Sequence, residues 1–140
     1  MSRCEAEFPR NREEPAGFDL VILSDVGADT LQVTPEVDAG DRDVDRCTVL
    51  AEWVRKGGAL GMGGGDMSFA GKGGQARYGN TALADALPVE IADADDRVET
   101  PVGATPRNRG VPGNAFPAEW THVFGYNRVS ATLTRTCGRQ

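Results

Sequence analysis

The apolar residues of this chain gather in short runs, and their spacing changes from one run to the next. Residues 18–25 (FDLVILSD) contain four consecutive apolar side chains, of which Val21 and Ile22 are β-branched. Such a run predicts a strand that is buried on both faces, as in a parallel sheet. Residues 59–62 (ALGM) predict a second, shorter strand.

Between these strands, residues 41–56 follow a helical period. One stripe collects the apolar side chains, which are Val44, Cys47, Leu50 or Ala51, and Val54. Aspartates at the start of the segment suit a helix N-terminus, and the glycines at 57 and 58 suit its end. The order strand, helix, strand predicts a right-handed parallel βαβ unit.

The segment after the second strand is rich in glycine. Six of the twelve residues 63–74 (GGGDMSFAGKGG) are glycine, which predicts a loop that leaves the end of the strand. Farther along, we expect a short helix over 81–87, capped by Asn80 or Thr81, and a loop over 103–119.

Three more strands are expected in the second half of the chain. They cover 89–92, 97–102 and 127–133, and the last of these shows alternating apolar positions. The acidic residues Asp93, Asp95 and Asp96 lie between the first two and predict a solvated turn.

Length and charge narrow the classes of partner. The 140 residues are 39% hydrophobic and 26% charged, which is typical of one globular domain. A net charge of −6 argues against binding to nucleic acid or to an anionic membrane surface. No apolar run reaches the roughly 18 residues of a membrane span. A small molecule or a second copy of the chain are the partners that we expect.

The sequence offers few thiol or imidazole groups. Its cysteines, Cys4, Cys47 and Cys137, are far apart, so no CxxC motif exists for a zinc ribbon or a thioredoxin-like site. We expect no metal, no cofactor and a reducing, cytoplasmic setting. Cys47 is expected to be buried and unreactive, since it lies on the helical stripe. The single histidine, His122, is predicted to be a partly buried structural residue rather than a base.

The candidate site lies where the two parallel strands end. In open α/β sheets, ligands bind beyond the carboxyl ends of the strands. Here Asp25 follows the first strand, and Asp66 follows the glycines of the second. Both are candidate catalytic carboxylates, although a strand-end aspartate such as Asp25 often only bonds loop amides. Ser24, Gly63, Gly64 and Gly65 are the ligand-binding candidates at this edge.

Several blocks of the chain, in the same order, point to one family. They are FDLVILSDVGA (18–28), EWVRKGG (52–58), MGGG (62–65) with SF (68–69) and Gly71, ARY (76–78), LPV (87–89), DRVE (96–99) and GYNR (125–128). From about residue 8 to residue 129 the chain resembles the "putative glutamine amidotransferase" family, which is similar to class I glutamine amidotransferases. The resemblance implies an α/β fold of three layers, flavodoxin-like, with a mostly parallel sheet. Its blocks add Ser68, Arg77 and Tyr78 to the ligand-binding candidates.

One departure from the class I pattern decides the functional expectation. Those enzymes release ammonia from glutamine with a cysteine on a tight strand-to-helix turn, assisted by a histidine and a glutamate. In this chain the turn should fall within residues 63–66, which contain no cysteine, and His122 is not in a His-x-Glu context. The resemblance therefore implies a domain without glutaminase activity that has a small-molecule binding or assembly role. The alternatives are a hydrolase or lyase that uses Asp25 or Asp66, and a purely structural or oligomer-forming fragment.

The resemblance also suggests how the chain is divided. We expect an irregular lead-in over 1–17, a partial amidotransferase-like domain over 18–129 and a divergent tail over 130–140. Members of the family are longer at both ends, so a truncated or frame-shifted product is expected, with an incomplete sheet that exposes an unpaired edge.

Overall fold

The structure is a computed structural model that describes residues 8–9, 11, 14–105 and 122–131. Its elements include short 3-10 helices, labelled η. In chain order they are η1 (Glu14–Gly17), β1 (Leu20–Ser24), α2 (Ala28–Gln32), α3 (Pro35–Asp38), α4 (Arg46–Arg55), β2 (Ala59–Gly63), η2 (Lys72–Gly74), η3 (Tyr78–Asn80), η4 (Ala84–Ala86), β3 (Val89–Glu90), β4 (Arg97–Ala104), β5 (Val123–Asn127) and β6 (Ser130–Ala131).

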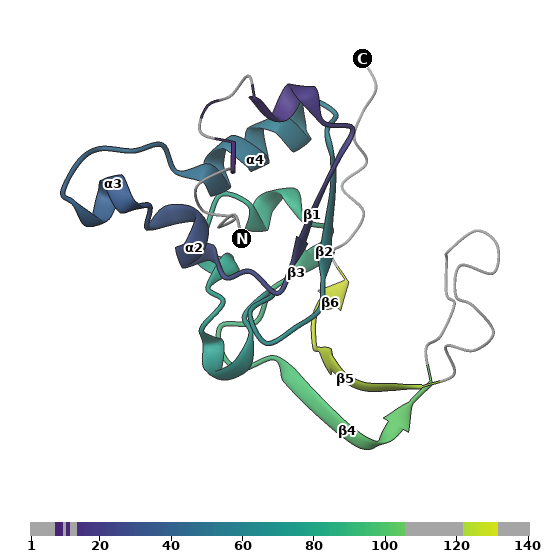
Figure 1. The fold of residues 1–140 in the computed structure, drawn as a ribbon. Helices are drawn as coiled ribbons and strands as arrows, with labels where there is room; N and C mark the ends of the chain where they lie inside the picture. The colour runs from purple at the N-terminus through teal and green to yellow at the C-terminus, as the bar shows by residue number, and fades with distance from the viewer. Residues whose placement is uncertain (1–7, 10, 12–13, 106–121, 132–140) are drawn as a thin grey trace, which may run out of the picture.

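The predicted order of strand, helix and strand with parallel strands is confirmed. β1 and β2 pair in parallel, from Leu20 opposite Ala59 to Ser24 opposite Gly63. The helix α4 precedes β2 and lies beside the two strands (Figure 1). The sequence patterns did not predict α2 and α3, two short helices that lie between β1 and α4.

The helix α4 begins later than predicted and ends where glycine was expected to stop it. Its cap is Asp45, whose carboxylate accepts hydrogen bonds from the Cys47 amide at 3.0 Å and from the Thr48 hydroxyl at 2.7 Å. Val44, which was predicted on the helical stripe, precedes the helix and is exposed. Gly57 follows the C-cap with φ +105°, a conformation that glycine adopts without strain.

The core lies against one face of β1. Leu23 is buried there together with Leu31, Leu50 and other side chains of α2 and α4. Leu20 and Ile22 point to the opposite face and are 52% and 65% exposed. The prediction that this strand is buried on both faces is therefore wrong. In the part of the chain that the structure describes, the α-helices lie to one side of β1 (Figure 1).

The other strands form two antiparallel pairs. β3 pairs with β6, and β4 pairs with β5 from Arg97 opposite Asn127. The β4–β5 hairpin projects from the helical part of the molecule (Figure 1). The strands expected at 89–92 and 97–102 are thus present with different bounds, whereas β5 was not predicted except for its last residue, Asn127.

The remaining local predictions are met in part. The helix expected over 81–87 is reduced to the 3-10 turn η4, whose N-cap is Leu83 and which has no side-chain cap, so the prediction of Asn80 or Thr81 as the cap is wrong. The Thr81 hydroxyl instead accepts a hydrogen bond from the Leu83 amide at 3.2 Å, ahead of the turn. The loop expected over 103–119 begins later, because β4 runs to Ala104, and 106–121 lie outside the described residues. Of the strand expected over 127–133, Asn127 ends β5, Ser130 and Ala131 form β6, and residues 132–133 lie outside the described residues.

The architecture is α/β, as predicted, with helices packed on a parallel strand pair. Among the described residues, no helix has the length and apolar composition that a membrane crossing requires.

Candidate functional site

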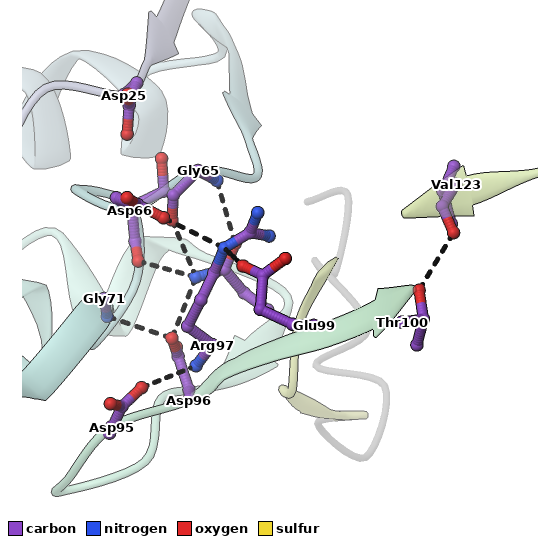
Figure 2. A network of polar contacts seen from close by, with 12 residues as sticks. Asp25, Gly65, Asp66, Gly71, Asp95, Asp96, Arg97, Glu99, Thr100 and Val123 are labelled. Atoms are coloured by element: carbon purple, nitrogen blue, oxygen red, sulfur yellow. Dashed lines mark hydrogen bonds and ion pairs between the residues drawn. The ribbon is translucent and has the colours of Figure 1, made fainter. Parts of the chain in front are cut away.

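The glycine-rich loop leaves the sheet where it was predicted to. β2 ends at Gly63, and residues 64–71 continue as turns and irregular backbone with no helix. A helix would satisfy its own amide groups, but a loop must find other partners for them. Side chains from three distant segments provide these partners, and they define the site (Figure 2).

The first of these side chains is Asn127, at the end of β5. Its Oδ1 accepts a hydrogen bond from the Gly65 amide at 2.8 Å, and its Nδ2 donates to the Gly65 carbonyl at 2.9 Å. A carboxamide carries the same donor and acceptor as a peptide group, so it binds Gly65 as a neighbouring strand would. Nδ2 also lies 3.2 Å from the Ser68 carbonyl and 2.8 Å from Asp96 Oδ1.

The second is Asp96, for which the prediction of a solvated turn is wrong. The residue is 3% exposed. Its carboxylate accepts hydrogen bonds from the amides of Ala70 at 2.9 Å and Gly71 at 3.0 Å, in addition to Asn127. A buried carboxylate is tolerated when donors surround it in this way. Asp96 therefore holds the glycine loop.

Asp93 and Asp95, the neighbours of Asp96 in the acidic turn, are exposed as predicted. The Gly73 amide, which bonds the Asp95 carboxylate, lowers the pKa of that group, and the Arg97 amide acts in the same direction.

The third is Asp25, one of the two candidate carboxylates. Its backbone has φ +54°, a region that aspartate enters more readily than most residues. Its Oδ1 accepts a hydrogen bond from the Met67 amide at 2.7 Å, the role named above as the alternative to catalysis. A β-carbon on Gly65 would lie only 2.8 Å from Asp25 Cγ, so glycine is needed for this close approach.

Asp66, the other candidate, follows Gly65 and is exposed. Its carboxylate accepts a hydrogen bond from Nε of Arg97 at 3.0 Å. The structure thus places Asp25, Gly65 and Asp66 together beyond the ends of β1 and β2 (Figure 2). We refer to residues 24–25 and 63–66 as the rim.

The sequence analysis missed Arg97, the first residue of β4. Its Nε also lies 3.2 Å from Glu99 Oε1, so it bridges two carboxylates. Residues two apart in a strand share a face, and this places Arg97 beside Glu99. The strand predicted over 97–102 was therefore enough to place Arg97 beside Glu99. The ion pair between Arg97 and Asp66 was not predictable from the sequence, because it depends on how β4 packs against the loop after β2.

The other ligand-binding candidates lie in different surroundings. Ser24 is exposed opposite Gly63, and Ser68 is buried with its hydroxyl unpartnered among the described residues. Arg77, with φ +60°, forms a surface ion pair with Asp29 at 3.1 Å. Tyr78 is buried and its hydroxyl donates to the Val26 carbonyl at 2.6 Å. Burial also raises the pKa of Tyr78.

The side chains of Arg77 and Tyr78 therefore contact the chain that follows β1, at Asp29 and Val26. Gly64 does approach the site, because a β-carbon there would lie 3.0 Å from Asn127 Oδ1.

The thiol and imidazole groups lie away from these contacts. Cys47 is buried in α4, as predicted, and burial raises the pKa of its thiol to about 12, with a further contribution from the Asp45 carboxylate. Cys4 and Cys137 fall outside the described residues. His122 is exposed, so the prediction of a partly buried histidine is wrong; its ring lies against Gly103, in the hairpin.

No group of three His, Cys, Asp or Glu side chains in the described ranges is arranged to hold a metal ion.

Comparisons with known proteins identify a family and similar solved structures, two of which are described below. The model of a family described as "Putative glutamine amidotransferase" matches residues 2–136. None of the curated proteins that were compared matches the chain. The cytoplasmic protein STM1381 from Salmonella typhimurium LT2 is 35% identical with a TM-score of 0.80, and the match covers 90% of this chain and 53% of that one.

The cytoplasmic protein STM3548 from Salmonella typhimurium is 34% identical with a TM-score of 0.79, and the match covers 91% of this chain and 53% of that one. The chain thus spans about half the length of each similar structure.

Proposed function

Because the chain belongs to the "Putative glutamine amidotransferase" family, we propose that it is an amidotransferase-like domain without glutaminase activity, which binds a small molecule at the rim. Both similar structures are described as cytoplasmic proteins, which supports a cytoplasmic location for this one.

The proposal depends on one observation: the turn after β2, residues 63–66, presents no thiol. Glutaminase chemistry of the class I type needs a thiol that attacks the side-chain carboxamide of glutamine. Residues 63–66 are three glycines and Asp66, and the Asp66 carboxylate is paired with Arg97. Cys47 is buried, and at a pKa of about 12 its thiol stays protonated at neutral pH.

The binding part of the proposal is supported by how firmly the loop is held. Asp25, Asp96 and Asn127 together fix the backbone of residues 65–71 through hydrogen bonds of 2.7 to 3.2 Å. A loop ordered by its own protein costs a ligand little conformational entropy on binding. The loop lies at the carboxyl ends of two parallel strands, the position at which open α/β sheets bind ligands.

The first half of the proposal is tested by ammonia release from glutamine. We expect the wild type and a variant with all three cysteines replaced (C4S, C47S, C137S) to release ammonia at the rate of the buffer alone. Release above that rate by the wild type contradicts the proposal. Loss of the activity in the triple variant would then identify a thiol mechanism, and its survival would identify another one.

The second half is tested by thermal unfolding of the full chain with a panel of small metabolites. A ligand that binds the folded state raises the midpoint of unfolding in proportion to the logarithm of its concentration. We expect at least one compound to do so, and less effectively with D66N than with D85N, whose aspartate is exposed in η4. A panel without any shift contradicts the binding role and favours a structural one.

A further inference from the structure

Resting on the proposed function, we propose that Arg97 is the ligand anchor, and that the ligand is a small zwitterion. Its carboxylate or phosphate group would bind the Nη1 and Nη2 end of the guanidinium. Its ammonium group would lie beside the carboxylates of Asp66 and Glu99.

The two ends of the guanidinium have different surroundings. Nε donates to Asp66 at 3.0 Å and lies 3.2 Å from Glu99, so this end is occupied. In the described part of the chain, neither Nη1 nor Nη2 has a hydrogen-bond partner, and Figure 2 shows them pointing away from Asp66. The Arg97 side chain as a whole is 20% exposed, so it is not sealed off from solvent. Two parallel N–H groups of arginine match a carboxylate or phosphate.

The backbone of β5 fixes the plane of the guanidinium. Gly125 has no side chain, and a β-carbon there would lie 2.8 Å from both Cζ and Nη1 of Arg97. The guanidinium therefore lies directly against the strand, with its orientation set by Gly125 on one side and by Asp66 and Glu99 at Nε. An arginine held in this way loses little further rotamer freedom when it binds a ligand.

The neighbouring charges select the kind of anion. Asp66 and Glu99 are 51% and 67% exposed and carry two negative charges against the single positive charge of Arg97. A simple anion would meet net repulsion at this distance, although solvent screening weakens it. A ligand that carries an ammonium group next to its carboxylate or phosphate relieves that repulsion and gains two acceptors. For this reason the geometry favours a zwitterion over an anion.

Chemical-shift titration of the full chain tests the proposal. The zwitterionic probes are glycine, which carries a carboxylate, and phosphoethanolamine, which carries a phosphate; acetate and methylammonium are the single-charge controls. We expect at least one zwitterion to bind at least about tenfold more tightly than either control, with shifts at Asp66, Arg97 and Gly125. The two probes tell a carboxylate ligand from a phosphate ligand.

Two variants remove the anchor without removing its charge. R97K keeps one positive charge but loses the paired N–H groups, and G125A pushes the flexible end of Arg97 off the strand. We expect each substitution to lower the affinity for the zwitterion about tenfold. The matched control is R55K in the exposed last turn of α4, which should bind like the wild type.

The outcomes separate this inference from the proposed function. If acetate binds as tightly as the zwitterions, the proposal that the ligand is a zwitterion is contradicted. If R97K and G125A both bind the zwitterion with wild-type affinity, the proposal that Arg97 is the ligand anchor is contradicted, even though a ligand site exists. If no zwitterion binds but another compound of the metabolite panel does, the inference fails and the proposed function stands. If nothing binds at all, both are contradicted.

Discussion

The side-chain amide of Asn127 pairs with both backbone groups of Gly65, which lies 62 positions away in the sequence. This pairing ties the end of β5 to the loop that leaves β2. Asp96 joins it by bonding Asn127 and the next part of the loop, at Ala70 and Gly71. The loop therefore depends on residues from the second half of the chain for its shape.

Replacing Asn127 by aspartate should release the loop. N127D keeps the size of the side chain but turns the donor Nδ2 into an acceptor that faces the Gly65 carbonyl and the Asp96 carboxylate. We expect a loss of about 2–3 kcal/mol in the free energy of unfolding and faster amide hydrogen exchange at Gly65. Urea unfolding measures the first effect, and N80D, at an exposed asparagine, is the control. Equal unfolding midpoints for N127D and N80D would refute the pairing.

The buried carboxylate of Asp96 should be more costly to alter than its exposed neighbour. D96N places an NH2 group among three donors, the amides of Ala70 and Gly71 and the Asn127 side chain. We expect D96N to lower the free energy of unfolding by about 2 kcal/mol, and D93N to change it by less than about 0.5 kcal/mol. Similar values for the two variants would show that Asp96 belongs to the solvated turn after all.

Gly65 and Asp25 should be energetically coupled. A β-carbon on Gly65 would overlap the Asp25 carboxylate, so G65A must displace that side chain from the Met67 amide. We expect G65A to destabilise the wild type by about 1–3 kcal/mol and a D25G background by less, because glycine removes the overlapping group and tolerates φ +54°. A double-mutant cycle by urea unfolding measures the difference. A coupling of zero would mean that the two residues do not touch.

The buried thiol of Cys47 predicts a loss of stability at alkaline pH. Its pKa is raised by burial from 9.0 to about 12 in the folded protein. Above pH 9 the unfolded chain therefore releases a proton that the folded chain retains, and stability that is complete below pH 9 is lost as the pH rises toward 12. We expect the free energy of unfolding to fall less steeply in C47A than in the wild type between about pH 8 and pH 11.

Tyr78 serves as the internal reference for that experiment. Burial raises its pKa as well, so some alkaline loss should remain in C47A. Parallel pH profiles for C47A and the wild type would show that the Cys47 thiol is solvated.

Local patterns predicted the βαβ unit well. The apolar run of β1, the helical stripe of α4 and the glycine stop at Gly57 each act over a few residues, and each appears in the structure near its predicted place. The depth of burial of β1 was not predictable in the same way. Whether the face of β1 that carries Leu20 and Ile22 is buried depends on which other segments pack against it. A run of apolar residues does not contain that information.

Only the residues at the ends of β1 and β2 were identified as site residues from the sequence. The ends of β1 and β2 placed Asp25 and Asp66 near each other, because parallel strands end on the same side of a sheet. Asp96, Arg97 and Asn127 were not identified, since their roles come from contacts with residues 25 to 62 positions away. An acidic turn with three aspartates gives no sign of which one is buried.

The central claim is that the turn after β2, residues 63–66, presents no thiol to attack a carboxamide. The most direct measurement is the intact mass of the folded protein after incubation with a diazoketone analogue of glutamine, which alkylates a nucleophilic thiol at a glutamine site. We expect the mass to remain that of the unmodified chain, as in a sample without the reagent. One equivalent of adduct on a cysteine, prevented by an excess of glutamine, would contradict the account.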